Sequence, residues 1–555
     1  MNYPKIPLAQ HIISLFESKK IKNIIISPGS RNAALSLGFA SNPYFQCYSI
    51  VDERCAAFFA LGIAQQTQQP TAVICTSGSA VLNYYPAVAE AFYSQIPIII
   101  LSADRPKNKI DIGDGQTIRQ ENVFENHSLY NANLTETASD ENDLDITTAI
   151  DFSIQFKGPV HINAPFEEPL YQMVDYKLTP SIQSDFTKQT IPIDRLNLSN
   201  FAEIWNTATK KLILVGTNFP NNIDPIITQK LVDDPSVVIL TENISNWHHP
   251  KIFGAIDALI SPFDEFQNLK FQPQILITFG GMIVSKRIKT LLRQYKPKHH
   301  WHIDPLYAND TFECLSQHFE FEVNDFFNAF QKLTIKSDSD YFQTIKNYQN
   351  KYQFRHQNFL ATAPFSDLKA FEIILNNLPK NCHLQLANSA TIRYAQLFEI
   401  DKTIKVCSNR GTSGIDGCTS TAIGAATTTS KQTILITGDL GFFYDSNALW
   451  NQYIPKNFKI ILINNGGGGI FRILPGHQET QIFDTFFETS HCLTAKNLAN
   501  MYDFDYFIAS KTDDLTPQLS SFFEHQNKSI LEIFTPTKLN NSVLTDYFAF
   551  LSKKD

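Results

Sequence analysis

The chain has 555 residues, too many for a single hydrophobic core, so we expect two to four domains. Hydrophobic residues make up 43% and charged residues 18% of it, the balance of an ordinary globular protein. A net charge of −8 without any block of Lys or Arg argues against a general affinity for nucleic acid, so an anionic ligand would need a local cluster of arginines.

Cysteine usage and the absence of export or membrane signals indicate where the protein resides. The eight cysteines are scattered without a Cys-x-x-Cys pair, which predicts buried thiols in a reducing compartment. The N-terminus opens directly into an amphipathic helix rather than a signal peptide. No apolar run reaches the roughly eighteen residues that a membrane span needs. The sequence therefore predicts a cytoplasmic protein without a membrane span.

The first part of the chain, residues 1–175, alternates short apolar strands with helical segments. This alternation predicts a parallel sheet with helices on both faces. A polar stretch with Pro180 and Pro192 follows and predicts a linker. The strands expected in this first domain cover residues 21–27, 46–50, 71–76, 97–102 and 159–164.

Two further α/β domains are expected, over residues 190–335 and 365–555. The polar segment 336–364 between them predicts a helical connector without a clear apolar stripe. The strands expected in the second domain cover residues 211–216, 237–241, 275–279 and 301–304.

The first and third domains resemble distant duplicates of each other. In each, an apolar strand runs into a Thr/Gly turn and a helix, at residues 73–83 and 435–445, and a second apolar strand follows at 97–101 and 458–462. The predicted fold class is α/β, with three doubly wound parallel-sheet domains, the first and third of which share one ligand.

The third domain contains two polar turns at the ends of successive apolar strands. Asp439 follows strand 432–437 and Asn465 follows strand 458–463, so the two residues are 26 positions apart. Ligands of open α/β sheets bind at the carboxyl ends of the strands. A hard cation such as Mg²⁺ takes oxygen ligands there, and glycines allow the backbone to approach a diphosphate. The motif predicts a metal–diphosphate site; its alternative is a βαβ unit with ordinary Gly and Asn turns.

This spacing resembles the thiamine diphosphate signature, in which Gly-Asp is followed about two dozen residues later by Asn-Asn. By that resemblance the Asp439 and Asn465 side chains and the Gly467 carbonyl hold Mg²⁺. Thiamine chemistry also needs a carboxylic acid that shares a proton with the pyrimidine ring, and Glu53, between a strand and a small-residue helix, is the candidate. The alternative is that Glu53 caps the helix N-terminus.

Ile415 lies in a glycine-rich loop at residues 410–417, where a large apolar side chain could bend the cofactor. A plain core isoleucine is the alternative. Several basic residues also lie near strand ends. A guanidinium group binds a carboxylate through two parallel hydrogen bonds, so a cluster of arginines predicts a polycarboxylate substrate. Taken singly, each would be a surface or salt-bridge residue. They are Arg31, Arg105, Lys286, Arg287, Arg393 and Arg410.

Together these motifs resemble the 2-succinyl-5-enolpyruvyl-6-hydroxy-3-cyclohexene-1-carboxylate synthase family of thiamine diphosphate enzymes, which acts in menaquinone biosynthesis. The Ser-Pro-Gly-Ser-Arg turn at 27–31, the Ala-Asp-Arg-Pro turn at 103–106 and Gly-Asp-Leu at 438–440 separate this family from most thiamine relatives. Two departures are visible: Gly115 and Gly466 stand where the family often has Asn.

The resemblance implies a transferase that decarboxylates 2-oxoglutarate and adds the resulting carbanion to isochorismate, with thiamine diphosphate and Mg²⁺ or Mn²⁺. It also implies a homodimer or a dimer of dimers with active sites between subunits. The implied catalytic residue is Glu53, and the implied cofactor residues are Glu53, Thr76, Ser77, Gly78, Ser389, Gly414, Ile415, Gly438, Asp439, Leu440, Asn465, Gly467 and Ile470. The implied substrate residues are Ser30, Arg31, Arg105, Gln116, Lys286, Arg287, Ser389, Arg393, Arg410, Ile470, Phe471 and Leu474.

Two other functions remain as alternatives. One is a related 2-oxo acid decarboxylase or acetohydroxyacid synthase, against which the arginines argue because its acceptors are small and neutral. The other is a non-catalytic paralogue, against which Glu53, Asp439 and Asn465 argue because all three are present. A nicotinamide- or flavin-binding site would require the motif Gly-x-Gly-x-x-Gly after an early strand. Neither of the glycine-containing segments 216–218 and 279–282 has this motif.

Overall fold

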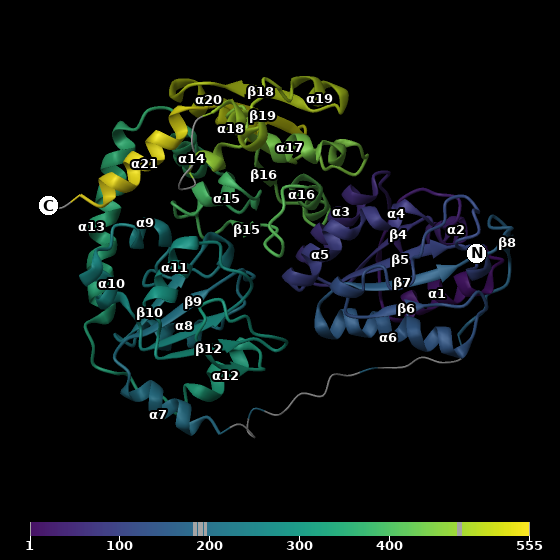
Figure 1. Ribbon diagram of the computed structural model, residues 1–555, viewed down its shortest axis with the longest axis horizontal. Coiled ribbons are helices and arrows are strands. Elements are labelled where there is room, and N and C mark those ends of the chain that lie inside the picture. The colour runs from purple at the N-terminus through teal and green to yellow at the C-terminus, as the bar shows by residue number, and fades with distance from the viewer. Residues whose placement is uncertain (1, 181–185, 187–192, 194–196, 474–479, 554–555) are drawn as a thin grey trace.

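The computed structural model describes residues 2–180, 186, 193, 197–473 and 480–553. It contains three parallel sheets with helices packed against them, and a short antiparallel pair of β1 (Tyr3–Pro4) with β8 (Met173–Val174). Figure 1 shows the N-terminal sheet on the right, the C-terminal sheet at the top and the central sheet at the lower left. The α/β fold class is therefore confirmed.

The N-terminal sheet has the strand order β3-β2-β4-β5-β7-β6. All five predicted strands are confirmed, whereas β6 was missed because Asn-Ala-Asn lacks an apolar run. Its strands are β2 (Asn23–Ile26), β3 (Gln46–Ser49), β4 (Thr71–Cys75), β5 (Ile98–Asp104), β6 (Asn131–Asn133) and β7 (Val160–Pro165), and its helices are α1 (Pro7–Ser18), α2 (Ala33–Ser41), α3 (Glu53–Thr67), α4 (Ser79–Asn83), α5 (Tyr85–Ser94) and α6 (Asp140–Phe156).

Both faces of this sheet are buried, as the near-continuous apolar strands predict. Ile24 and Ile26 of β2 belong to a core cluster with α1, α2 and α6. Ile25 points to the opposite face, because side chains alternate along a strand, and joins a cluster with α3 and α5.

The central sheet has the order β10-β9-β11-β12-β13. The four predicted strands are confirmed, and β13 was missed because it is a half-exposed edge strand with polar residues in alternation. Its strands are β9 (Lys211–Val215), β10 (Val237–Thr241), β11 (Ile275–Phe279), β12 (His299–Ile303) and β13 (Leu315–Phe319), and its helices are α7 (Ser199–Thr207), α8 (Pro225–Val232), α9 (Ile256–Ile260), α10 (Glu265–Phe271), α11 (Lys286–Gln294) and α12 (Val323–Phe330).

The C-terminal sheet has the order β15-β14-β16-β17-β19-β18. The N-terminal and C-terminal sheets have the same topology. If the six strands of each sheet are numbered along the chain, their order across the sheet is 2-1-3-4-6-5 in both. This identity supports the predicted duplication. The strands are β14 (His383–Leu386), β15 (Lys405–Cys407), β16 (Thr433–Gly438), β17 (Lys459–Asn464), β18 (Asp505–Ala509) and β19 (Ser529–Phe534), and the helices are α14 (Asp367–Asn376), α15 (Ala390–Ala395), α16 (Cys418–Ala426), α17 (Asp439–Tyr444), α18 (Gln481–Phe483), α19 (Lys496–Met501), α20 (Thr512–Glu524) and α21 (Leu539–Leu551).

The connector forms the long helix α13 (Tyr341–Thr362), which packs against α9 and α21. A helical connector was predicted, but the prediction that it lacks an apolar face is wrong. Tyr341, Ile345, Tyr352 and Leu360 are buried at helical spacing, and two of the four are tyrosines, whose hydroxyls bind Gln267 and the Phe271 carbonyl. Because tyrosine has a polar hydroxyl group, the sequence pattern did not indicate that these positions form an apolar stripe.

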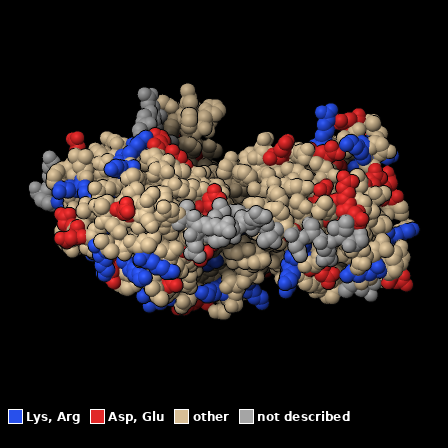
Figure 2. Space-filling model, turned by 90° about the horizontal axis from the view of Figure 1, so that it is seen from below, with Lys and Arg blue, Asp and Glu red and all other residues tan. Residues whose placement is uncertain are grey.

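All eight cysteines are unpaired thiols; five are buried, and Cys492 is exposed, so the prediction of buried thiols is wrong for that residue. No helix among the described residues combines the length and the apolar composition that crossing a bilayer requires. Figure 2 shows Lys and Arg lying among Asp and Glu over the face that it presents.

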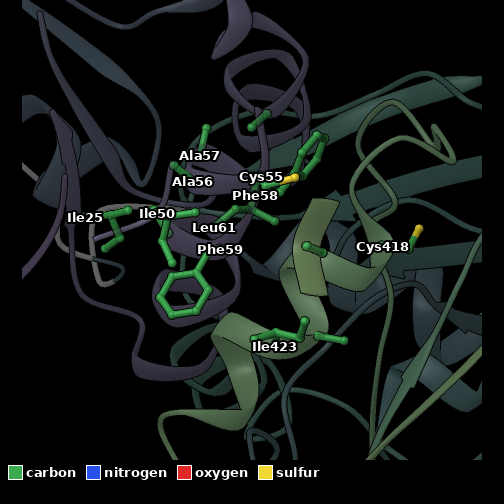
Figure 3. Close-up of a cluster of buried hydrophobic side chains, with 14 of the residues drawn as sticks. Ile25, Ile50, Cys55, Ala56, Ala57, Phe58, Phe59, Leu61, Cys418 and Ile423 are labelled. Atoms are coloured by element: carbon green, nitrogen blue, oxygen red, sulfur yellow. The ribbon is translucent and has the colours of Figure 1, made fainter. Parts of the chain in front are cut away.

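The N- and C-terminal domains pack together through α3 and α16, and one hydrophobic cluster contains residues of both sheets. Figure 3 shows part of this cluster, with Phe59 of α3 and Ile423 of α16 among the labelled side chains. The helices approach closely at two glycines. A Cβ atom at Gly62 would lie 2.1 Å from the Thr421 carbonyl oxygen, and one at Gly424 would lie 2.0 Å from the Phe59 carbonyl oxygen. Both obstacles are backbone atoms, so a side chain at either position would force the helices apart.

We therefore expect Gly424→Ala to destabilise the protein by about 2 kcal/mol, because overpacking outweighs the gain in helix propensity of about 1 kcal/mol. Thermal and urea unfolding of the purified protein measure this. Gly115→Ala is the control, because its Cβ would meet no atom within 4 Å. Equal stability of the two variants would contradict the close approach of the helices.

Candidate functional site

Asp439 and the Asn465 turn lie side by side at one edge of the C-terminal sheet, as predicted. Strands β16 and β17 are parallel neighbours, with Gly438 opposite Ile463. The buried Asp439 carboxylate accepts hydrogen bonds from the backbone N–H groups of Leu440 (2.7 Å), Gly466 (2.9 Å) and Gly467 (3.0 Å). The carboxylate therefore holds the glycine turn in place, while burial raises its pKa.

Asn465 supplies the second side-chain oxygen of this site. Its amide nitrogen donates to Oδ2 of Asp367 (3.0 Å), and the Thr537 hydroxyl donates to its backbone carbonyl. Its Oδ1 atom is buried and has no hydrogen-bond partner among the described residues. A buried acceptor without a partner is costly unless a ligand satisfies it, so this oxygen fits a cation ligand.

The glycines of the turn have conformations that suit a bound group. Gly466 and Gly467 have φ values of +78° and +153°, and a Cβ at Gly467 would lie 2.7 Å from the Glu488 carbonyl oxygen. Asn tolerates a left-handed φ better than most residues, so the φ of Gly466 is compatible with the Asn that the family often has there. A Cβ at Gly438 would meet no atom within 4 Å, which leaves open space beside Asp439.

The donor set fits Mg²⁺ or Mn²⁺ with a diphosphate. The Gly467 carbonyl accepts from Gly469 N–H (3.0 Å) and keeps a second lone pair. Among the described residues no group of three or more His, Cys, Asp and Glu could hold a metal ion. A cation at this edge would therefore depend on one carboxylate, one amide oxygen, one carbonyl and oxygens of its ligand, which is the preference of a hard cation.

Glu53 is the first residue of α3, but it does not cap that helix. The Asp52 side chain accepts from Cys55 N–H and is the cap. Within the part of the chain that the structure describes, the half-buried Glu53 carboxylate has no partner on another residue. Burial, and then the neighbouring Asp52 charge, raise its pKa. A raised pKa favours the protonated form of this carboxyl group, which is the form that can share a proton with a ligand.

The residues on either side of Glu53 bind the C-terminal domain. Arg54 donates to the Tyr444 carbonyl (2.9 Å), and Asn447 donates to the Asp52 carboxylate (2.8 Å). Tyr444 ends the helix that Asp439 begins. Glu53 is therefore held at the contact between the two domains.

Ile415 is half-buried rather than a core residue, which counts against the alternative interpretation. It lies beside α17: a Cβ at Gly441 would be 3.7 Å from the Ile415 Cβ. The start of its loop is held by the N-terminal domain, because the buried Glu90 carboxylate of α5 accepts from the N–H groups of Gly411 (2.7 Å), Thr412 (2.7 Å) and Ser413 (3.3 Å).

Three predicted cofactor residues, Thr76, Ser77 and Gly78, form the turn after β4. Thr76 Oγ1 accepts from Arg31 N–H (3.2 Å), and Ser77 donates to the Gln116 carbonyl (2.9 Å). Gly78 has a φ of +89° and donates through its N–H to Gln120, which was not predicted. These contacts place the Arg31 backbone and Gln116 beside the turn.

The arginines of the N-terminal domain already have protein partners. The buried Arg31 guanidinium donates to the Phe166 carbonyl (2.9 Å) and to the Glu168 carboxylate (3.3 Å). Arg105 forms an ion pair with Asp114, in which Nη1 lies 3.7 Å from Oδ2. The Nε atoms of both arginines are buried without a partner among the described residues, so each keeps a donor for a ligand. Ser30 and Gln116 are exposed.

A second basic group forms where the central and C-terminal domains meet. Arg393 donates to the Ser389 carbonyl (2.6 Å) and Arg410 to the Asn388 side chain (2.7 Å), while Nε of Arg410 is buried without a partner among the described residues. Arg287 stacks on the Phe548 ring at 4.1 Å. Lys286, beside it, is exposed.

Two acids at this junction were missed. Buried Glu242 accepts from the N–H groups of Val284 and Ser285, at the start of α11, and burial raises its pKa to about 7. Asp257 binds the Ser285 hydroxyl; burial raises its pKa, and the charges of Arg287 and Arg393 oppose that rise. Both acids hold the helix that carries Lys286 and Arg287.

The two basic groups share no contact among the residues of one chain that the structure describes. No hydrogen bond or ion pair among the described residues links Ser30, Arg31, Arg105 or Gln116 to the group at the central–C-terminal junction. Ile470 and Phe471 are half-buried in the short helix Gly469–Ile473, and Leu474 lies outside the described residues.

Glu90 and Asp367 were also missed by sequence reasoning. Glu90 is a lone acid on the buried face of α5, between Ala87 and Ala91, and that position was the available signal. Asp367 follows the cap residue Ser366 and reads as an ordinary helix start.

Comparison with known proteins identifies both ligand-binding halves. Residues 6–129 match the family described as thiamine pyrophosphate enzyme, N-terminal TPP binding domain. Residues 389–533 match the family described as thiamine pyrophosphate enzyme, C-terminal TPP binding domain. The first range contains Glu53 and the second contains Asp439 and Asn465, so the predicted thiamine diphosphate cofactor is confirmed.

Three proteins that are similar over the full length or nearly the full length of the chain share the name 2-succinyl-5-enolpyruvyl-6-hydroxy-3-cyclohexene-1-carboxylate synthase. The protein of Flavobacterium johnsoniae is 59% identical and that of Flavobacterium psychrophilum 58% identical, each over 100% of both chains. The protein of Christiangramia forsetii is 50% identical over 99% of this chain and 100% of its own. With its two cofactor domains and this similarity, the chain belongs to the 2-succinyl-5-enolpyruvyl-6-hydroxy-3-cyclohexene-1-carboxylate synthase family of thiamine diphosphate enzymes.

Proposed function

We propose that this enzyme decarboxylates 2-oxoglutarate and adds the resulting succinyl carbanion to isochorismate, in menaquinone biosynthesis in the cytoplasm. The product of such a reaction is the compound in the relatives' name. One observation carries the substrate assignment. Three arginines of the two basic groups, Arg31, Arg105 and Arg410, have a buried Nε atom without a hydrogen-bond partner among the described residues. The two substrates bring four carboxylates, which such donors bind.

Each side chain has a defined task in this proposal. Bound thiamine diphosphate supplies the carbon nucleophile and stabilises the negative charge left when CO₂ departs. Glu53 holds a proton at the pyrimidine ring, and its raised pKa suits that exchange. Ile415 sets the shape of the bound cofactor from beside α17. The basic residues orient the two substrates, and Ile470 and Phe471 exclude water.

The metal site of the proposal consists of Asp439, Asn465 and the Gly467 carbonyl, with Mg²⁺ or Mn²⁺. Its support is the unpartnered Oδ1 atom of Asn465 and the open space at Gly438. We also propose the domain division 1–175, 190–335, 336–364 and 365–555, because each sheet lies within one range.

A homodimer, or a dimer of dimers, would complete the site. Within one chain the N-terminal basic group and the junction group remain unconnected among the described residues. A second subunit that places its N-terminal domain against this C-terminal domain would bring the two groups to one cavity.

The test is an assay of the purified protein with thiamine diphosphate and Mg²⁺ that follows isochorismate by its absorbance. We expect isochorismate consumption only when 2-oxoglutarate is present. CO₂ release from a 2-oxo acid without isochorismate consumption would overturn the acceptor and favour a simple decarboxylase. Inactivity towards every 2-oxo acid, with the cofactor bound, would favour a non-catalytic paralogue.

A further inference from the structure

Asp367 is a fully buried carboxylate that makes its contacts next to the metal site. It lies at the first position of α14, with only 2% of its surface exposed. Its Oδ2 atom accepts from the amide nitrogen of Asn465 (3.0 Å), and its Oδ1 atom accepts from the Thr535 hydroxyl (2.5 Å). Its own N–H donates to Asn540 (2.8 Å). Three segments that are distant in sequence, around residues 367, 465 and 535–540, therefore meet at this residue.

These contacts decide which end of the Asn465 amide enters the metal site. A primary amide has one accepting end and one donating end. If the amide were rotated by half a turn, its oxygen would face an Asp367 oxygen and two acceptors would oppose each other. The observed orientation leaves Asn465 Oδ1, an oxygen without a partner among the described residues, as the free end. The rotated one would present an NH₂ group, which repels a cation.

We propose that Asp367 is a positioning residue that locks the Asn465 amide with its oxygen towards the Mg²⁺ or Mn²⁺ ion of the cofactor site. The inference rests on the metal site proposed above. Residues that orient metal ligands through a hydrogen bond alter metal affinity about 10- to 100-fold when they are changed. Asp367 does not itself touch the ion, so its loss should weaken metal binding without removing a ligand.

The experiment compares Asp367→Ala with Asp367→Asn in the full-length protein. The Ala variant has no acceptor for Asn465, so we expect its Mn²⁺ dissociation constant, measured by electron paramagnetic resonance at saturating thiamine diphosphate, to rise about 10- to 100-fold. The Asn variant keeps an acceptor oxygen for Asn465 while its own NH₂ donates to the Thr535 hydroxyl. Its dissociation constant should stay within about threefold of the wild-type value, because the acceptor for Asn465 is preserved and only the bond to Thr535 reverses its direction.

Two further measurements separate orientation from general damage. Thr535→Val removes the bond to the other Asp367 oxygen and leaves the Asn465 contact, so it should bind Mn²⁺ like the wild type. Activity of Asp367→Ala should recover at saturating Mn²⁺, since the ligands remain. Asp367→Leu has the branched shape of Asp without an acceptor and replaces the Ala variant if that protein does not fold.

The outcomes are distinguishable from a failure of the proposed function. Wild-type binding in Asp367→Ala would overturn the inference, and so would an equal loss in Asp367→Asn, because charge rather than the hydrogen bond would then act. No Mn²⁺ binding to wild-type protein with thiamine diphosphate would instead overturn the proposed metal site. Tight Mn²⁺ binding without isochorismate consumption would overturn only the substrate assignment and leave the positioning role testable.

Discussion

Glu53→Gln is expected to lower kcat about 10³-fold, within the range that general acid–base groups contribute. Gln has nearly the same shape but cannot exchange a proton with the pyrimidine ring. Because Glu53 has no partner on another residue among the described residues, the substitution breaks no contact that holds the fold. Thiamine diphosphate should still bind, so the defect should appear in kcat and in single-turnover rates rather than in cofactor affinity.

The pH dependence of stability gives a second readout for the same variant. Burial raises the folded pKa of Glu53 above its ordinary value of 4.5, so the neutral form is favoured in the folded state. The stability that protonation contributes is present below pH 4.5 and is lost as the pH rises through the folded pKa. Gln mimics the neutral form, so at pH 7 the cofactor-free variant should be at least as stable as the wild type.

Asp52→Asn is the matched control for Glu53→Gln. Asn is also a good helix cap, and Asp52 caps α3 through Cys55 N–H. We expect it to change kcat far less than Glu53→Gln does. If the two variants lost equal activity, or if Glu53→Gln lost cofactor binding in proportion to activity, Glu53 would be a structural residue rather than a proton carrier.

Glu90→Ala is expected to destabilise the protein by roughly 3 kcal/mol, because it leaves buried backbone N–H groups without an acceptor. Glu90 accepts from Gly411, Thr412 and Ser413 N–H and from the Thr412 hydroxyl (2.9 Å), so one carboxylate joins α5 of the N-terminal domain to the loop of Ile415. With that loop released, thiamine diphosphate should bind about tenfold more weakly, a change of about 1.4 kcal/mol.

Denaturant unfolding and calorimetric titration with the cofactor measure both effects of Glu90→Ala. Glu121→Ala is the control, since Glu121 forms an exposed ion pair with Lys107 at 3.2 Å and such pairs contribute about 0–1 kcal/mol. Glu90→Gln should lose less stability than Glu90→Ala, because its oxygen end can accept from Thr412 and Ser413 while its NH₂ end opposes only the Gly411 N–H group. A Glu90→Ala protein with wild-type stability and cofactor affinity would show that the loop holds its shape without the N-terminal domain.

Local sequence patterns determined the strands, the turns and the main polar motif. Runs such as Ile24–Ile26 and Ile460–Leu462 are apolar enough to be buried on both faces, so a parallel sheet follows from periodicity alone. Asp439 and Asn465 each follow such a run, and strands that are neighbours along the chain are usually neighbours in a sheet. Their proximity could therefore be predicted without a structure. Short or polar elements such as β6 carry no such pattern and were missed.

Only the tertiary structure decided which partner each polar group has. Asp52 rather than Glu53 caps α3, and Asp367 and Glu90 bind residues that are 98 and more than 300 positions away, respectively. Such contacts depend on how whole elements pack, and no local periodicity encodes them. The same holds for the arginines: the sequence determined that they exist, but packing decided that they form two separate groups. Residue types and spacing thus specify the chemistry available, whereas the burial and pairing that tune it arise from contacts between distant segments.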